Sequence, residues 1–156
     1  MIKIEIPGRP PLVLEYLVTD FNGTIAERGC LLDGVGARLR TVSEQLQITV
    51  LTADTFGQAR NEMRDLPVEV VILSGGNEDA AKAAHVLQLG SSHTIALGNG
   101  HNDRLMLEEA ALGLVVIQGE GTASTAMEAG DVLFRDVRDA LDALLDPQRL
   151  VATLRS

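Results

Sequence analysis

Asp20 is the first residue of this sequence whose type and position suggest chemistry. It follows a short apolar run at residues 17–19, and Gly23 allows the chain to turn sharply just beyond it. In open α/β sheets, ligands bind outside the carboxyl ends of the strands. Asp20 is therefore a candidate nucleophile, and the hydroxyl and N–H of Thr24 suit a phosphate oxygen. The ordinary alternative is a buried strand that ends in an Asx-type turn.

Polar residues follow other apolar runs in the same way. Thr52 ends the next run, and Asn99 and Asp103 lie just beyond a later one, while Lys82 falls early in an expected helix. Because the ends of parallel strands converge on one crevice, these side chains are expected near Asp20. Two of these residues also have ordinary interpretations: a Thr at a strand end can cap a turn, and a helical Lys is usually solvated.

Hydrophobic periodicity predicts the elements that must position these residues. Residues 2–19 predict a β-hairpin that leads into the Asp20 strand, after which helices and strands alternate. The expected strands cover 48–52, 68–73, 93–97, 112–117 and 132–134, and the expected helices cover 33–46, 55–63, 77–90 and 104–110, with three more starting at 122, 136 and 146. The expected caps are Asp33, Thr55, Asn77, Asp136 and, with Pro147 after it, Asp146. The pattern predicts a three-layer, Rossmann-like α/β fold with a mostly parallel central sheet.

Length and composition narrow the possible functions. The 156 residues are expected to form one domain, and no apolar run approaches the length of a membrane span. The net charge of −9 opposes non-specific binding to nucleic acid or to anionic membranes. The start of the chain alternates apolar and polar residues, unlike a signal peptide, and Cys30 is the lone cysteine. We therefore expect a cytoplasmic protein with no membrane insertion.

The polar positions together resemble the four motifs of the haloacid dehalogenase (HAD) superfamily. Asp20, Thr52, Lys82 and Asp103 fall on these motifs in the right order, and the resemblance covers residues 15–135. Within the superfamily the sequence is most similar to soluble relatives of the P-type ATPase phosphorylation domain, whose Gly-Asp-Gly-x-Asn-Asp signature reads Gly-Asn-Gly-His-Asn-Asp at 98–103. The resemblance implies a HAD-like fold, and neither insertion site has room for a cap domain.

The resemblance also implies roles for individual residues. Asp20 would be phosphorylated, Thr52 would donate its hydroxyl to a phosphoryl oxygen, and Lys82 would bring positive charge to the phosphate. Further phosphate contacts would come from Gly23, Thr24 and Ala53. The expected cofactor is Mg²⁺, held by the Asp20 carboxylate, the Asn22 backbone carbonyl and Asn99, with Asp103 close by. Among the alternatives, His101 is a disfavoured metal ligand because Mg²⁺ prefers oxygen, and Arg60 and Arg64 lie on an earlier helix.

Two residues depart from the superfamily pattern. Asn22 stands where most phosphatases of the superfamily have a general acid/base Asp, and an amide cannot exchange a proton usefully. Asn99 stands where an Asp metal ligand is usual, so one negative charge is missing. The sequence therefore predicts a slow Mg²⁺-dependent phosphohydrolase that acts on a phosphorylated small molecule or nucleotide. The alternative is a binding or regulatory protein that keeps the fold and has lost turnover.

The missing cap leads to one more expectation. A capless site must be covered by the hairpin, by a neighbouring subunit or by the substrate itself. We therefore expect a homo-oligomer with the hairpin of residues 2–19 at or beside the interface.

Overall fold

Six parallel strands form the centre of the fold, in the spatial order β10, β9, β8, β3, β6, β7. The structure is a computed structural model that describes residues 1–54 and 57–156. The strands of this sheet are β3 (Tyr16–Asp20), β6 (Gln47–Thr52), β7 (Glu69–Ile72), β8 (Thr94–Gly98), β9 (Leu112–Val116) and β10 (Val132–Phe134). The predicted parallel sheet is confirmed.

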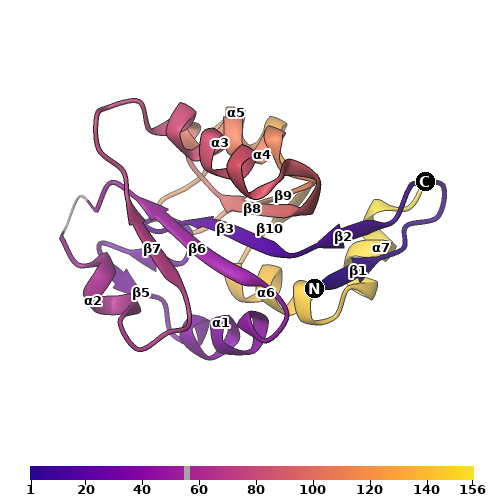
Figure 1. Cartoon of the computed structure of the whole chain (residues 1–156), viewed down its shortest axis with the longest axis horizontal. Coiled ribbons are helices and arrows are strands. Elements are labelled where there is room, and N and C mark those ends of the chain that lie inside the picture. Colours follow the sequence, from indigo (N-terminus) through magenta and orange to yellow (C-terminus); the bar gives the residue numbers. More distant parts are fainter. Residues whose placement is uncertain (55–56) are drawn as a thin grey trace.

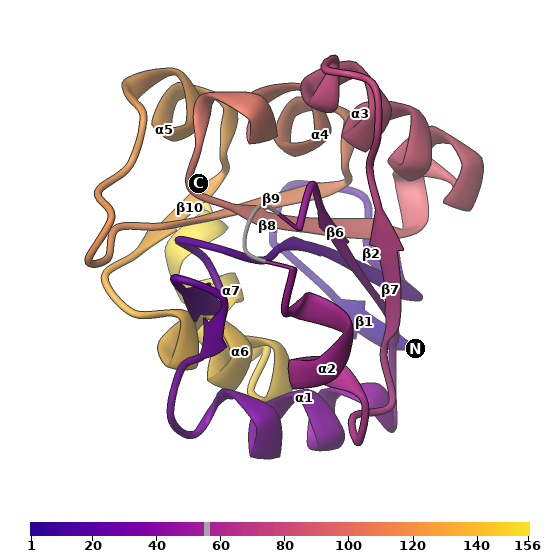
Figure 2. The same ribbon diagram turned by 90° about the vertical axis from the view of Figure 1, so that its left-hand side faces the viewer.

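Helices cover both faces of this sheet, as Figures 1 and 2 show. One face carries α3 (Glu78–Leu89), α4 (Arg104–Glu109) and α5 (Ser124–Ala129), and the other carries α1 (Val35–Ser43), α2 (Ala59–Met63) and α6 (Val137–Leu145). The last helix, α7 (Gln148–Leu154), packs against α6 and the N-terminal strand. No helix of the described residues is both long and apolar enough to cross a membrane. The predicted three-layer α/β fold is confirmed, and no cap domain is present in the part of the chain that the structure describes.

The strands hold the layers together because their side chains alternate between two hydrophobic cores. In β8, Ile95 and Leu97 pack with α1 and α6, whereas Ala96 packs with α3, α4 and α5. All three side chains are fully buried. Burial on both faces explains why the strands read as continuous apolar runs in the sequence.

The N-terminal hairpin is shorter than predicted and lies far from Asp20. It consists of β1 (Ile2–Ile4) and β2 (Leu12–Leu14), and β3 then starts as a separate strand of the main sheet. Its apolar side belongs to the same core as Leu150 of α7. Because the hairpin precedes the amino end of β3, it extends away from the carboxyl end, where Asp20 lies (Figure 1). The hairpin therefore cannot cover the site of its own chain.

A second, small hairpin was not predicted from the sequence. It pairs β4 (Ala26–Glu27) with β5 (Cys30–Leu31) directly after the Asp20 turn. The two residues between these strands, Arg28 and Gly29, have positive φ angles of 50° and 81°. Positive φ at both positions is what a tight two-residue hairpin turn requires.

Of the helix caps predicted from the sequence, one is confirmed by a side-chain hydrogen bond and three are not. Asp136 caps α6 as predicted, because its side chain accepts a hydrogen bond from the Arg138 N–H. Gly34, with a left-handed backbone, precedes α1 instead of Asp33, and the Asn77 side chain makes no capping bond to α3. Pro147, not Asp146, directly precedes α7. The cap predicted at Thr55 lies outside the described residues.

Candidate active site

A buried lysine joins two carboxylates at the carboxyl end of the sheet. Lys82 Nζ lies 2.7 Å from Asp20 Oδ1 and 2.7 Å from Asp103 Oδ1. The side chains of Lys82 and Asp103 are 1% and 0% exposed, and that of Asp20 is 12% exposed. Buried charges of this kind are stable only when they are paired. The predicted convergence of these three residues is therefore present in the structure.

Each of the three residues comes from a different element. Asp20 is the last residue of β3, and Asp103 ends the short 3-10 helix η2 (His101–Asp103) that follows β8. Lys82 lies on α3, where it and Val86, one turn later, are the buried residues of the helix. The interpretation of Lys82 as a solvated helical lysine is therefore wrong, because its side chain extends from the apolar stripe of α3 towards the sheet.

The electrostatics of this cluster reflect one ammonium shared by two carboxylates. Burial, followed by repulsion from Asp103, raises the pKa of Asp20 to about 7, although Lys82 opposes this rise. Burial disfavours the charged form of Lys82, but attraction to Asp20 and Asp103 outweighs it and raises the Lys82 pKa. Lys82 is therefore charged at neutral pH, and the cluster has more negative than positive groups. Such a cluster can accept a further cation.

Asp103 also organises the loop that follows β8. Its Oδ2 accepts hydrogen bonds from the N–H groups of Asn99, at 2.9 Å, and Gly100, at 2.8 Å. A Cβ on Gly98 would lie 2.6 Å from the Asp103 carboxyl carbon, so only glycine fits there. Asp103 thus holds the Asn99 loop in place while its other oxygen binds Lys82.

Thr24 connects Asp20 with Asn99. Its hydroxyl lies 3.3 Å from Asp20 Oδ2 and 3.1 Å from Asn99 Oδ1. Thr24 is fully buried, and Asn99 is 7% exposed. The Gly-Thr turn after Asp20 therefore has a structural task besides the predicted phosphate contact, because it fixes the carboxylate relative to the next strand end.

The other predicted site residues line the same strand ends. Asp20 pairs with Leu51 of β6, so Thr52 lies one residue beyond this pair. Thr52 is buried, and its hydroxyl accepts a hydrogen bond from the Asp54 N–H at 2.9 Å. This bond fits the turn-capping interpretation and leaves the hydroxyl hydrogen available. Ala53 is half-buried beside it, and its predicted phosphate contact remains a prediction.

Asn22 fastens the small hairpin to the site. Its side-chain Oδ1 accepts a hydrogen bond from the Gly29 N–H at 2.7 Å. The residue that replaces the usual acid/base Asp thus holds the tip of the β4–β5 hairpin.

Gln118 is a positioning residue that sequence reasoning missed. Its Nε2 donates to the carbonyls of Thr24, at 2.7 Å, and Gly23, at 3.4 Å, and its Oε1 accepts from the Val137 N–H at 2.8 Å. Gln118 therefore ties the turn after Asp20 to the start of α6. Nothing in the local sequence around Gln118 indicates this positioning role.

A cavity of about 280 Å³ lies beside this turn. It is bounded by the β4–β5 hairpin and by the loops that follow β9 and β10, and its lining includes Gly23, Glu27, Glu120 and Arg135. The cavity is large enough for a few water molecules or a small polar group.

The residues fit a hard divalent cation. Oxygen atoms of Asp20, Thr24 and Asn99 lie together, as the Thr24 distances show. Within residues 1–54 and 57–156, no group of three or more His, Cys, Asp or Glu side chains is arranged to hold a metal ion. The chain would thus offer few carboxylates, together with neutral oxygens and room for waters. This donor set suits Mg²⁺, which keeps several of its waters.

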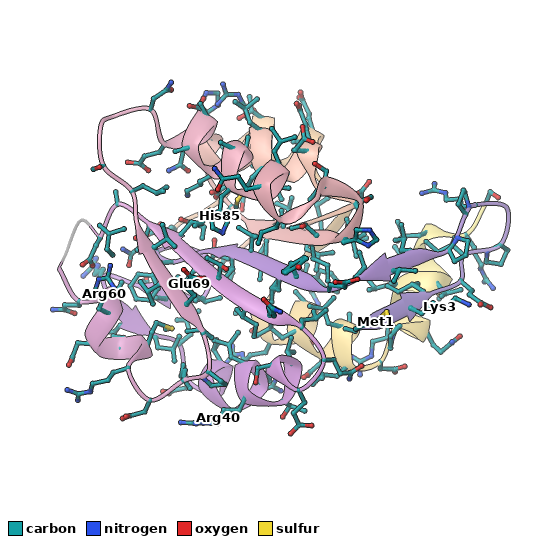
Figure 3. The ribbon with its side chains drawn as sticks, viewed as in Figure 1. Met1, Lys3, Arg40, Arg60, Glu69 and His85 are labelled. Carbon is teal, nitrogen blue, oxygen red and sulfur yellow. The ribbon has the colours of Figure 1, made fainter. Side chains whose placement is uncertain are left out.

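The alternative candidates lie outside this cluster. Arg60 belongs to α2, on the face of the sheet opposite to α3, as Figure 3 shows, and Arg64 follows the same helix. His101 Nδ1 is 2.8 Å from the Thr125 hydroxyl and belongs to the exposed side of η2. His85 is half-buried near Glu69 at the sheet edge (Figure 3), and burial lowers its pKa. Lys82, not an arginine, therefore supplies the positive charge beside Asp20.

The chain has a clear relative among curated proteins. It is 42% identical over 84 residues to the uncharacterised protein MJ0073 of Methanocaldococcus jannaschii, which covers 51% of this chain and 90% of that protein. This chain belongs to the family of MJ0073. No family model matches the sequence.

Solved structures of HAD proteins share the fold. The 3-deoxy-D-manno-octulosonate 8-phosphate phosphatase of Moraxella catarrhalis, solved with magnesium, phosphate and KDO, superposes with a TM-score of 0.70 at 15% identity, over 91% of this chain and 94% of that one. The cobalt-bound phosphatase of Haemophilus influenzae gives 0.71 at 15% identity, over 92% and 94%. This chain therefore has the capless HAD fold.

The predicted likeness to P-type ATPases also has a structural counterpart. A zinc-transporting PIB-type ATPase superposes with a TM-score of 0.62 at 22% identity, over 78% of this chain. The match covers 20% of the transporter, so it concerns one part of that protein. At identities of 15–22%, these superpositions establish the HAD fold of the chain and do not establish its activity.

Proposed function

We propose that this protein is a Mg²⁺-dependent phosphohydrolase that forms an aspartyl-phosphate on Asp20. The observation that carries the proposal is the buried Lys82, which contacts both Asp20 and Asp103 at 2.7 Å. Desolvating a lysine and two carboxylates costs free energy that their attraction only partly returns, so function explains this cluster better than stability does. The HAD phosphatases that share the fold, one solved with magnesium and one with cobalt, support a hydrolase with a divalent metal.

The proposed reaction has two steps. First, an oxygen of Asp20 bonds to phosphorus while the bond between phosphorus and the leaving-group oxygen breaks. Then water attacks the aspartyl-phosphate, which releases inorganic phosphate and restores the carboxylate. Lys82 and the Thr52 hydroxyl would stabilise the phosphoryl oxygens. Mg²⁺ held by Asp20, the Asn22 carbonyl and Asn99, with Asp103 behind them, would neutralise phosphate charge.

The substrate class follows from the missing acid. Asn22 cannot protonate a departing oxygen, so we propose phosphorylated small molecules or nucleotides with good leaving groups, and slow turnover. We place the protein in the cytoplasm, because its single cysteine cannot form an intramolecular disulfide.

A binding or regulatory protein is the second candidate function. Asn22 favours this candidate, because its side chain cannot act as an acid or base and instead accepts a hydrogen bond from the Gly29 N–H.

Trapping the phosphoenzyme separates the two functions. The protein is incubated with labelled acetyl phosphate and Mg²⁺, then denatured in acid, and the label on Asp20 is counted. Hydrolase function predicts label on the wild type and none on Asp20→Asn, whose amide keeps the shape but is not a nucleophile. A wild type that takes up no label from acetyl phosphate or ATP would support the binding protein instead.

Restoring an aspartate at position 99 is expected to tighten Mg²⁺ binding. Asn99→Asp places a second charged oxygen beside Asp20, so the dissociation constant should fall several-fold. Isothermal titration calorimetry with MgCl₂ measures the change, and Asn61→Asp on α2 adds the same charge away from the site as a control. An unchanged or larger dissociation constant for Asn99→Asp would remove the argument from the lost charge.

We also expect a homo-oligomer, with the N-terminal hairpin at or beside the interface. The hairpin cannot cover its own site, so a neighbouring subunit or the substrate itself must shield the open crevice, and we propose the neighbouring subunit. Light scattering at micromolar concentration should give a multiple of the 16.6 kDa chain mass. A mass of one chain would count against this expectation.

A further inference from the structure

Glu120 lies against the candidate metal site although it is distant from it in the sequence. The position that a Cβ on Gly23 would occupy is 2.3 Å from Glu120 Oε2, 2.6 Å from Asn99 Nδ2 and 2.9 Å from Asn99 Oδ1. The Glu120 carboxylate and the Asn99 amide therefore meet over Gly23, three residues after Asp20. A side chain at Gly23 would separate them.

Two hydrogen bonds connect the backbone that follows Glu120 with Asn99. Asn99 Nδ2 donates to the Gly121 carbonyl at 3.1 Å, and the Ala123 N–H donates to the Asn99 carbonyl at 3.0 Å. The Thr122 hydroxyl, expected at a helix start, instead donates to the Val116 carbonyl at 2.6 Å. The loop that carries Glu120 is thus held at the end of β9, beside Asn99.

The amide at position 99 does something that an aspartate could not do. A carboxylate has no hydrogen to donate to the Gly121 carbonyl, and it would repel Glu120 across Gly23. Among the described residues, no Lys, Arg or His forms an ion pair with Glu120. Glu120 is exposed beside the site, and none of the ion pairs in the described part of the chain includes its carboxylate.

We propose that Glu120 supplies the negative charge that Asn99 lacks, by accepting hydrogen bonds from water molecules bound to the metal. Glu120 is exposed, so a water molecule can stand between its carboxylate and the metal. The inference rests on the metal site of the proposed function. It adds to that function, because the negative charge that is missing at Asn99, after β8, is supplied by Glu120 in the loop after β9.

Calorimetric titration with MgCl₂ tests the role of Glu120 without any substrate. Glu120→Gln should raise the Mg²⁺ dissociation constant by about three- to tenfold, the size expected for removing one solvated charge near a divalent ion. Glu27→Gln is the matched control, because Glu27 lines the same cavity from the hairpin side. It should change the dissociation constant less than twofold.

A double substitution tests whether a carboxylate at position 99 can replace the carboxylate of Glu120. Asn99→Asp should tighten Mg²⁺ binding more in the Glu120→Gln background than in the wild type, because the two carboxylates then no longer compete. Equal dissociation constants for Glu120→Gln and the wild type would overturn the role of Glu120, as would a wild type that binds no Mg²⁺. If the wild type binds Mg²⁺ and Glu120→Gln weakens binding, but no phosphoenzyme forms, the metal role stands and the hydrolase function fails.

Discussion

Lys82→Met is expected to abolish labelling of Asp20 and to lower the free energy of unfolding by about 3–5 kcal/mol. The methionine side chain fills a similar volume but leaves Asp20 and Asp103, both buried, without a counter-charge. Removing one partner from a buried ion pair costs more than the pair contributes, because an uncompensated charge stays behind. Urea unfolding at pH 7.5 without metal measures the stability, and acid-trapped label from acetyl phosphate measures the chemistry.

The loss of stability should depend on pH. Without Lys82, the pKa of Asp20, already raised to about 7 by burial and by Asp103, rises further. The folded state then holds a proton that the unfolded state releases, so stability falls as pH rises from the ordinary carboxyl pKa through the folded one. Lys82→Met should therefore recover stability on acidification from pH 7.5 to 5.

Lys3→Met is the control for losing a lysine. Lys3 pairs with Glu5 on the surface, where its side chain is 57% exposed, so its loss should cost less than about 1 kcal/mol. If Lys82→Met is as stable as Lys3→Met, the buried cluster does not hold the charges that its geometry implies.

The strand ends were predictable because a parallel sheet brings them together. Asp20 and Asp103 each follow an apolar run, and the rule that ligands bind at carboxyl ends of strands sufficed to place them together. The burial of Lys82 could also have been inferred. It lies four residues before Val86, so both occupy one stripe of α3, and the alanines around it allow close packing.

The β4–β5 hairpin could not be predicted from local sequence. Its strands have two residues each, and its turn uses Arg28 with a positive φ, where Asn or Asp would be the usual signal. Bonds from elsewhere in the chain hold it in place. Asn22 accepts from the Gly29 N–H, and Glu62 of α2 accepts from the Leu31 N–H at 2.9 Å. The approach of Glu120 to Asn99 is a tertiary contact of the same kind.

Asn22→Asp is expected to speed hydrolysis of the aspartyl-phosphate by one or more orders of magnitude, because general acid/base groups typically contribute about 10²–10⁴ in rate. In the wild type, Asn22 cannot activate water, so the phosphoenzyme should form faster than it breaks down and label should accumulate on Asp20. An aspartate would keep the hydrogen bond to the Gly29 N–H with one oxygen and leave the other free to take a proton from water.

The hydrogen bond from the Gly29 N–H also predicts which of the two reaction steps Asn22→Asp accelerates most. An N–H that donates to a carboxylate lowers its pKa, so an aspartate at position 22 should be ionised at neutral pH and act better as a base than as an acid. Asn22→Asp should therefore accelerate the breakdown of the phosphoenzyme more than its formation from alkyl phosphates, which need a proton on the leaving oxygen. A chase with unlabelled acetyl phosphate measures breakdown, and phosphate release from alkyl and nitrophenyl esters compares the leaving groups.

Two further variants decide whether the gain comes from a base at position 22. Asn22→Ala removes the bond to Gly29 and adds no base, so it should be no faster than the wild type. Adding Asp20→Asn to Asn22→Asp should abolish the gain, because no aspartyl-phosphate can form. If Asn22→Asp stays inert even toward nitrophenyl phosphate and acetyl phosphate, the missing base is not what limits this site, and the protein is better explained as a HAD fold that binds its ligand without turning it over.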